Sequence, residues 1–123
     1  MNLIRKAEAP VFTRPGLKVT GLASPKRGAT ENCVWRISLA PSTAGVPHAV
    51  TREEIFVGIG GQAVVTVDGV EQVLGAGDAV IVPPGTLFSL ANPHAEPFEA
   101  VVTFPVGGQA VMDAKTFTPP WAE

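Results

Sequence analysis

Short runs of alternating hydrophobic and polar residues recur along the whole chain, and Gly or Pro separates most of them. Alternation with a period of two is typical of β-strands that bury one face. No segment keeps the period of about 3.6 residues that marks an amphipathic helix. The runs that predict strands are Leu17–Leu22, Cys33–Ala40, Glu54–Ile59, Gln62–Val67, Ala79–Val82, Leu87–Ala91 and Phe98–Phe104. The pattern therefore predicts an all-β sandwich or barrel.

One turn in this pattern is specific. Asp68-Gly69 lies between the runs VTV and VEQV. Asp-Gly tolerates the positive φ angles that a two-residue β-hairpin requires. The sequence predicts a tight hairpin at this point.

The predicted strand Glu54–Ile59 is apolar on both faces. Glu54 and Phe56 share one face, and the other carries Ile55, Val57 and Ile59. If Glu54 faces inward, the aliphatic face needs cover from a second subunit, from the N-terminal arm, or from both. We expect a homodimer.

Composition narrows the class of protein. A length of 123 residues predicts one domain, and a net charge of −2 with a pI near 5.6 argues against nucleic acid as a partner. The longest charge-free stretch, Ala79 to Ala95, contains Pro83, Pro84 and Pro93, which excludes a membrane-spanning helix there. With no signal-peptide pattern and a single cysteine, Cys33, the sequence predicts a cytoplasmic protein without an internal disulfide.

Two stretches, 41–61 and 77–92, have a distinctive spacing of His, Glu, Gly, Pro and Asn. The residues that carry this spacing are His48, Glu54 and Gly61 in the first stretch and Gly77, Pro83, Gly85 and Asn92 in the second. The two stretches resemble the two motifs of the cupin superfamily. The resemblance implies a single cupin domain over 1–123, a double-stranded β-helix or jelly-roll barrel, in which 1–31 form an N-terminal arm and first strand.

The motifs also depart from the family pattern. Val50 and Phe88 stand where the family has two further histidines. Metal-binding cupins hold one ion with up to three histidines and one glutamate, whereas this chain keeps His48 and Glu54, with His94 as its only other histidine. A site with two or three protein ligands binds a divalent ion more weakly than one with four. The resemblance therefore implies a degenerate metal site and no tightly bound metal.

The leading functional hypothesis is binding of a small organic molecule inside the barrel. The resemblance places His48 and Glu54 inward, where an imidazole beside a carboxyl group can exchange protons near neutral pH. Arg36, if it also points inward, would favour an anionic substrate. The expected walls are Val50, Phe56, Phe88 and Leu90.

Two alternatives stay open. In the first, the protein is a metal-dependent oxygenase or isomerase, and His48 and Glu54, with His94 if it folds in, hold a weakly bound divalent ion. In the second, it is a non-catalytic structural dimer in which His48 and Glu54 hydrogen-bond to each other inside a packed core. Whether a reaction is catalysed, which substrate is bound, and which way Arg36, His94 and Glu99 point are left open by the sequence.

Overall fold

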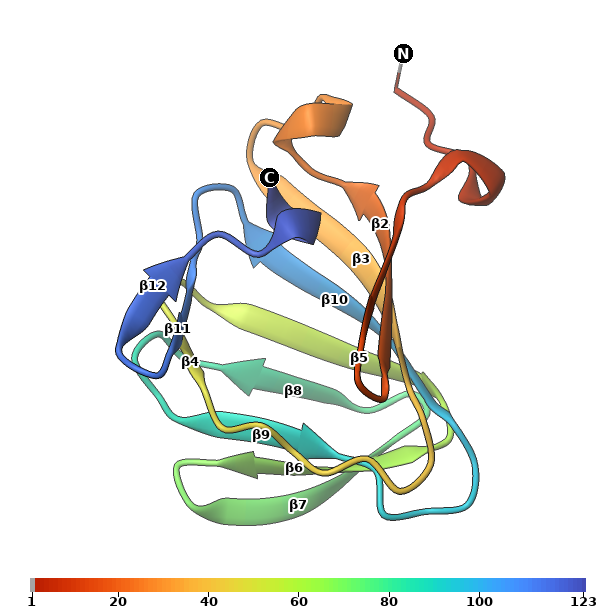
Figure 1. Ribbon diagram of the computed structural model, residues 1–123, viewed down its shortest axis with the longest axis vertical. Helices are drawn as coiled ribbons and strands as arrows, with labels where there is room; N and C mark the ends of the chain where they lie inside the picture. Colours follow the sequence, from red (N-terminus) through yellow and green to blue (C-terminus); the bar gives the residue numbers. More distant parts are fainter. Residues whose placement is uncertain (1) are drawn as a thin grey trace.

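The computed structural model describes residues 2–123, so the first residue of the predicted domain lies outside the described part (Figure 1). Strands dominate it, and its helices are short 3-10 turns. The strands are β1 (Val11–Arg14), β2 (Leu17–Ala23), β3 (Asn32–Leu39), β4 (Ala49–Val50), β5 (Glu54–Gly60), β6 (Gln62–Val67), β7 (Val70–Gly75), β8 (Ala79–Val82), β9 (Phe88–Ala91), β10 (Phe98–Pro105), β11 (Ala110–Met112) and β12 (Lys115–Phe117). The 3-10 turns are η1 (Lys6–Glu8), η2 (Pro25–Arg27) and η3 (Pro120–Ala122). No helix in residues 2–123 is long and apolar enough to cross a membrane.

The strands form three antiparallel sheets. The largest has the order β1-β2-β3-β10-β5-β8, and the smaller ones have the orders β12-β11-β4 and β7-β6-β9. Figure 1 shows the large sheet facing β6, β7 and β9 across the interior, as in a jelly roll. Between residues 2 and 123 the sheets stay separate, so the barrel is open and not one continuous ring of hydrogen bonds.

The strands predicted from alternation are confirmed with small shifts at their ends. The predicted hairpin is also confirmed: Val67 pairs with Val70, and Asp68 and Gly69 both have positive φ angles, 50° and 78°. The pattern missed β1, β4, β11 and β12, which have two to four residues each. With two or three residues each, β4, β11 and β12 contain too few alternations to be recognised.

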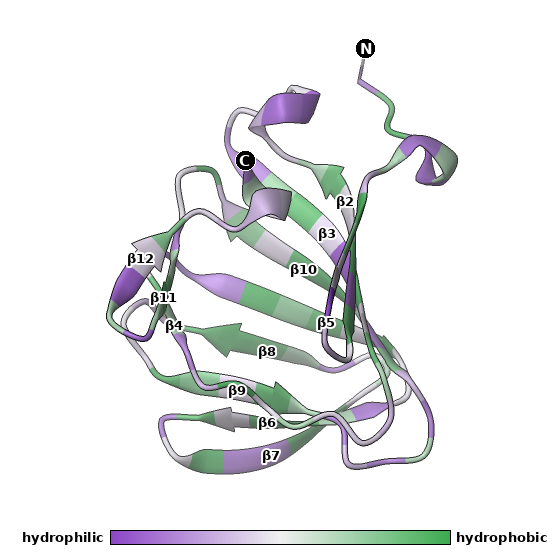
Figure 2. Ribbon diagram, viewed as in Figure 1, coloured by the Kyte–Doolittle hydropathy of each residue, from purple (hydrophilic) through white to green (hydrophobic). Residues whose placement is uncertain are grey.

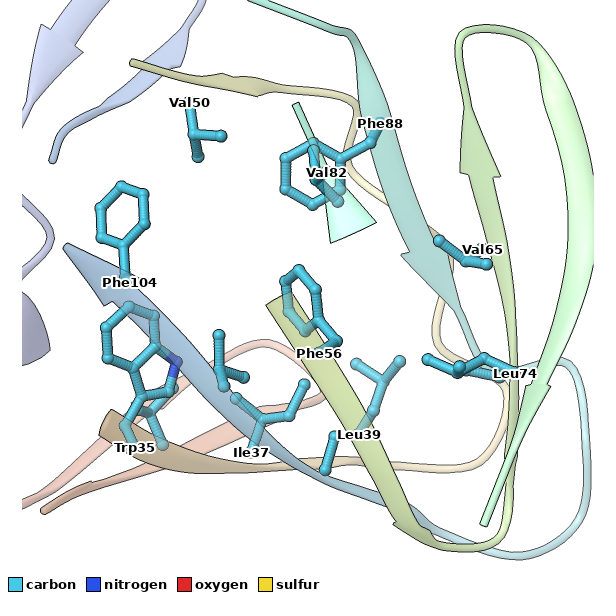
Figure 3. Packing of buried hydrophobic residues seen from close by; sticks show 14 of the residues in the cluster. Trp35, Ile37, Leu39, Val50, Phe56, Val65, Leu74, Val82, Phe88 and Phe104 are labelled. Carbon is cyan, nitrogen blue, oxygen red and sulfur yellow. The ribbon is translucent and has the colours of Figure 1, made fainter. Parts of the chain in front are cut away.

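Alternation along β3, β5 and β10 builds the core. In β3 and β10 every second residue is buried, and β5 follows the same pattern over its first five residues. Figure 2 shows hydrophobic residues concentrated on the strands and hydrophilic ones on η1 and η2. Figure 3 shows Trp35 from β3, Phe56 from β5 and Phe104 from β10 directed toward the same interior. Because side chains alternate between the faces of a strand, the residues between them point away from this core.

The outer face of the large sheet stays partly apolar. Ile55 and Val57 are half-buried, while Ile59 and Ile81 are 44% and 58% exposed. The predicted two-faced character of Glu54–Ile59 is therefore present in the structure, with Glu54 on the inner face. A second subunit over this outer face stays a prediction.

The last residue of the second motif, Asn92, ties two loops to the sheet. Its side chain is fully buried, and its amide nitrogen donates to the carbonyls of Leu39 (3.0 Å) and Glu96 (2.8 Å). Its side-chain oxygen accepts from the backbone N–H of His94 at 3.0 Å, and its backbone pairs with Thr43. Both amide hydrogens, the side-chain oxygen and both backbone groups of this asparagine therefore have a partner. The motif asparagine has a structural role here.

We expect Asn92→Ala to lower the free energy of unfolding by roughly 2–4 kcal/mol, because it leaves buried carbonyl and N–H groups without partners. Urea unfolding followed by circular dichroism measures this change. The matched control is Asn32→Ala at an exposed position of β3, which should cost well under about 1 kcal/mol. Equal losses in the two variants would contradict the role of Asn92.

Candidate active site

The two motif segments are joined through their backbones at the barrel interior. His48 and Phe88 form a two-hydrogen-bond bridge, His48 N–H to Phe88 O at 3.0 Å and Phe88 N–H to His48 O at 2.9 Å. Close by, the N–H of Gly85 donates to Val50 O at 2.9 Å. Gly85 has φ +75°, a conformation that glycine adopts without strain. The Pro-any-Gly turn of the second motif therefore positions the histidine segment of the first.

His48 is held in one tautomer. Its Nδ1 lies 2.8 Å from the carbonyl oxygen of Val46, which can only accept, so Nδ1 carries the proton and donates. Nε2 is then an unprotonated acceptor. Burial lowers the pKa of His48, and the hydrogen bond to Val46 opposes this shift without cancelling it. The imidazole is accordingly neutral at neutral pH, with a lone pair available on Nε2.

Glu54 is the acidic side chain buried inside the barrel. It begins β5, is 6% exposed, and pairs across the sheet with Val82, which is fully buried. Within residues 2–123 the Glu54 carboxyl group takes part in no hydrogen bond and no ion pair. Burial raises its pKa from 4.5 to about 8. A charged carboxylate is costly in such surroundings, so Glu54 is protonated at neutral pH.

Aromatic rings connect the two polar groups. The His48 ring packs against Phe88 with 4.3 Å between ring centroids, and Phe88 packs against Phe56 at 5.8 Å. Phe56 is two residues beyond Glu54 on the same face of β5. No hydrogen bond or ion pair links His48 to Glu54. The alternative in which these two side chains satisfy each other in a packed core is therefore wrong in that detail.

The predicted wall residues lie on the interior side. Val50, Phe56 and Phe88 are 3%, 6% and 1% exposed, and Leu90 packs against the same core. Figure 3 shows Val50, Phe56 and Phe88 around the interior, together with Phe104 and Val82. The surroundings of Glu54 and His48 are thus apolar, which is the physical reason for both pKa shifts.

Arg36 does not belong to this site, which corrects the expectation of an inward arginine. Its neighbours Trp35 and Ile37 are buried, so alternation directs Arg36 to the outer face. There its Nη2 lies 3.9 Å from Oε2 of Glu99, which is also on the outer side. His94 lies in the loop after Asn92, and its Nε2 is buried without a hydrogen-bond partner.

The donor set does not fit a tightly held metal ion. The residues at the family's four ligand positions are His48, Val50, Glu54 and Phe88, and two of them have no donor atom. No group of three or more His, Cys, Asp or Glu side chains within residues 2–123 could hold an ion. Structural and catalytic sites for divalent transition metals use at least three protein ligands.

Sequence reasoning identified His48 and Glu54 but missed the carbonyl of Val46. This backbone group selects the His48 tautomer, and therefore decides which ring nitrogen keeps a free lone pair. A hydrogen bond from a side chain to a backbone carbonyl two residues earlier in a loop cannot be predicted from the residue types. Only the folded loop brings the carbonyl to the ring.

Comparison with known proteins decides the family. The sequence profile of the cupin domain matches residues 35–104, which include both motifs and the strands between them. The chain belongs to the cupin family. A β-D-galactosidase of Mycobacterium tuberculosis, Rv1717, is 35% identical to this cupin over 96 residues, which cover 75% of this chain and 83% of the relative.

Solved structures support the same fold. An RmlC-like cupin from Shewanella frigidimarina has a TM-score of 0.74 at 24% identity, covering 85% of this chain and 90% of its own. The polyketide cyclase RemF from Streptomyces resistomycificus also has a TM-score of 0.74, at 16% identity, covering 98% of this chain and 82% of its own. These likenesses establish the cupin jelly roll as the fold of this chain.

The raised pKa of Glu54 predicts a pH-dependent stability. The carboxyl is protonated in both states below its unfolded pKa of 4.5, and folding then carries no ionisation cost. As the pH rises from 4.5 to about 8, the unfolded state loses its proton first, so the free energy of unfolding falls. Glu54→Gln cannot ionise, and its stability relative to the wild type should rise by on the order of 3 kcal/mol between pH 5 and pH 8.

Thermal unfolding of both proteins at the two pH values measures this difference. The matched control is Glu53→Gln, which changes the exposed neighbouring carboxylate and should shift Tm equally at both pH values. If Glu54→Gln also shifts Tm equally at both, Glu54 is not a buried protonated acid.

A histidine introduced at position 88 is expected to create metal affinity near His48 and Glu54. Position 88 lies directly opposite His48, so Phe88→His adds a third donor near His48 and Glu54. We expect Ni²⁺ or Zn²⁺ to raise the Tm of Phe88→His, by the equivalent of about 2–3 kcal/mol at a hundredfold excess over Kd. The wild type and the double variant Phe88→His with His48→Ala should show no comparable shift. A shift of the same size in the double variant would mean that the ion binds elsewhere.

Proposed function

We propose that this cupin binds a small organic substrate in its barrel and transfers protons to and from it, with Glu54 as the acid and His48 as the base. The observation that carries the proposal is the Glu54 carboxyl, buried, without a partner and protonated at neutral pH. A buried unpaired acid is unfavourable for stability, and groups of this kind cluster at functional sites.

The two groups differ in the way that acid–base catalysis needs. Glu54 holds a proton up to about pH 8, whereas burial lowers the pKa of His48 so that Nε2 is free to accept one. One group can therefore donate while the other accepts within the same pH range. The apolar walls support this division because they keep water from levelling the two pKa values.

The sugar-related relative indicates which substrate class to test first. Rv1717, at 35% identity, is a β-D-galactosidase by name. Glycoside hydrolysis requires an acid that protonates the leaving oxygen and a base that activates water or a nucleophile that attacks carbon. A carboxylic acid of raised pKa fits the first task. We propose a β-D-galactoside, or a sugar of similar size, as the substrate.

On such a substrate Glu54 and His48 are sufficient to supply and remove the protons of hydrolysis. Glu54 donates its proton to the glycosidic oxygen as the bond from that oxygen to the anomeric carbon breaks. His48 Nε2 takes a proton from the water that forms the new bond to the same carbon. Afterwards the imidazolium proton returns to the Glu54 carboxylate through solvent. The usual second carboxylate is replaced by His48, a departure from the common pair of acids.

The leaving group distinguishes an acid role from a structural one. With lactose, whose leaving alcohol is a weak acid, Glu54→Gln should lower kcat/KM by roughly a hundredfold or more. With 4-nitrophenyl β-D-galactoside, whose leaving group needs little protonation, the loss should be much smaller. Glu53→Gln is the matched control and should behave as the wild type. A similar loss on both substrates would contradict acid catalysis by Glu54.

The pH profile of the wild type on the same substrates supplies a second readout. Activity should fall at high pH as Glu54 loses its proton near 8, and at low pH as His48 becomes charged below its ordinary value of 6.5. His48→Gln should remove the low-pH limb together with most of the activity. No galactoside turnover above that of His48→Gln would overturn the proposed substrate class.

A further inference from the structure

A hollow lies on the outer face of the large sheet, opposite the inner face that carries Glu54. It has a volume of about 360 Å³, at the lower end of the range of small-molecule sites, roughly 300–1,000 Å³. It is bounded by Ile4, Lys6, Lys18, Thr20, Leu22, Arg36, Ile37, Ser38 and Glu99. The floor is therefore the outer face of β2, β3 and β10, and the N-terminal segment forms one side, which Figure 1 shows passing close to β2.

Register explains why these side chains gather. Lys18 pairs with Ser38, and Ser38 pairs with Glu99, so these three form one row across the sheet. In the next outward-facing row, Thr20 pairs with Arg36. Residues directly opposite in adjacent strands project from the same face. The hollow is thus a consequence of strand pairing, with two side-chain hydroxyls and two cations projecting from neighbouring rows.

Charge in the hollow is positive, although the chain as a whole has a net charge of −2. Lys6, Lys18 and Arg36 face a single carboxylate, Glu99. Cations that share one carboxylate in a concave space create a local positive potential, and this attracts anions more strongly than a flat surface does.

Hydrogen-bonding capacity in the hollow is largely unused. The guanidinium of Arg36 approaches Glu99 Oε2 no closer than 3.9 Å and forms no hydrogen bond with residues 2–123. Glu99 Oε1 accepts instead from the Ser38 hydroxyl at 3.1 Å. Within the described chain neither Lys6 nor Lys18 forms an ion pair, whereas the exposed Lys26 pairs with Glu123 at 3.1 Å. The donors around this hollow are available to a ligand.

We propose that this outer hollow binds a small organic anion, a molecule with a phosphate or carboxylate group on a compact carbon body. Arg36 presents a planar fork of N–H donors that matches such an oxyanion, and Lys6 and Lys18 add charge. Ile4 and Leu22 offer apolar surface to the carbon body. The proposal is independent of the chemistry inside the barrel, because Glu54 lies on the inner face of the large sheet and the hollow lies on its outer face.

Isothermal titration calorimetry at low salt tests the proposal with four probes: glucose 6-phosphate, glucuronate, glucose and inorganic phosphate. The first two combine an anionic group with a sugar body, and the last two have only one of these features. We expect at least one charged sugar to bind, glucose not to bind, and inorganic phosphate to bind more weakly than the charged sugar. The stronger of the two charged sugars tells whether phosphate or carboxylate is preferred. No binding of either at millimolar concentration, or equal binding of glucose, overturns the proposal.

Substitutions locate the bound probe. Arg36→Gln should weaken binding by about tenfold or more, because it removes the charged fork. Glu99→Gln should tighten binding severalfold, since it removes the competing negative charge and keeps an acceptor for Ser38. A gain of affinity of this kind cannot result from partial unfolding. The matched control Arg52→Gln removes an exposed arginine outside the hollow and should bind as the wild type.

Two patterns contradict this site. If Arg52→Gln weakens binding as much as Arg36→Gln, the attraction is a general effect of net charge. If Glu54→Gln abolishes binding while Arg36→Gln retains it, the probe occupies the barrel. Failure of galactoside hydrolysis, in contrast, would leave the binding result at the outer hollow unaffected.

Discussion

Burial of every second residue in β3, β5 and β10 is the constraint on which the rest of the molecule depends. The core between the sheets needs Trp35, Phe56 and Phe104 on one face, and the pleat then determines the direction of every residue between them. Glu54 projects from the same face of β5 as Phe56 and therefore lies in the apolar interior. Arg36 projects from the face of β3 opposite to Trp35 and therefore lies on the outside of the sheet. One packing rule thus sorts the acid of the barrel from the arginine of the outer hollow.

Burial of Glu54 connects stability with chemistry. The same loss of water that makes its carboxylate unfavourable keeps the proton on the acid at neutral pH. An ion pair with a nearby cation would restore stability and abolish this property, and within residues 2–123 no such pair is formed. His48 differs from Glu54 in having a partner: its Nδ1 donates to the Val46 carbonyl, and its Nε2 keeps a free lone pair. Burial therefore keeps Glu54 protonated and His48 neutral at neutral pH.

Several residues of the two cupin motifs shape the backbone. Asn92 and Gly85 make the backbone and side-chain hydrogen bonds that bring the motifs together. Gly61 has φ +70°, and a side chain there would collide with the carbonyl of Pro97. Val50 and Phe88, at the positions of the absent histidines, have become wall residues of the core. The fold is compatible with apolar side chains at these two positions because Gly61, Gly85 and Asn92 maintain the backbone.

The sequence by itself determined the strands, the Asp68-Gly69 hairpin, the cupin family and the pair His48 and Glu54, because alternation, turn chemistry and motif spacing are local properties of the chain. It did not determine the direction of Arg36, since an isolated strand has two faces and only packing chooses the buried one. Nor did it predict the short strands β1, β4, β11 and β12, because these segments are strands only through their hydrogen bonds to neighbouring strands. The ionisation of Glu54 and the outer hollow were decided by tertiary structure, because burial and strand register bring together residues far apart in the chain.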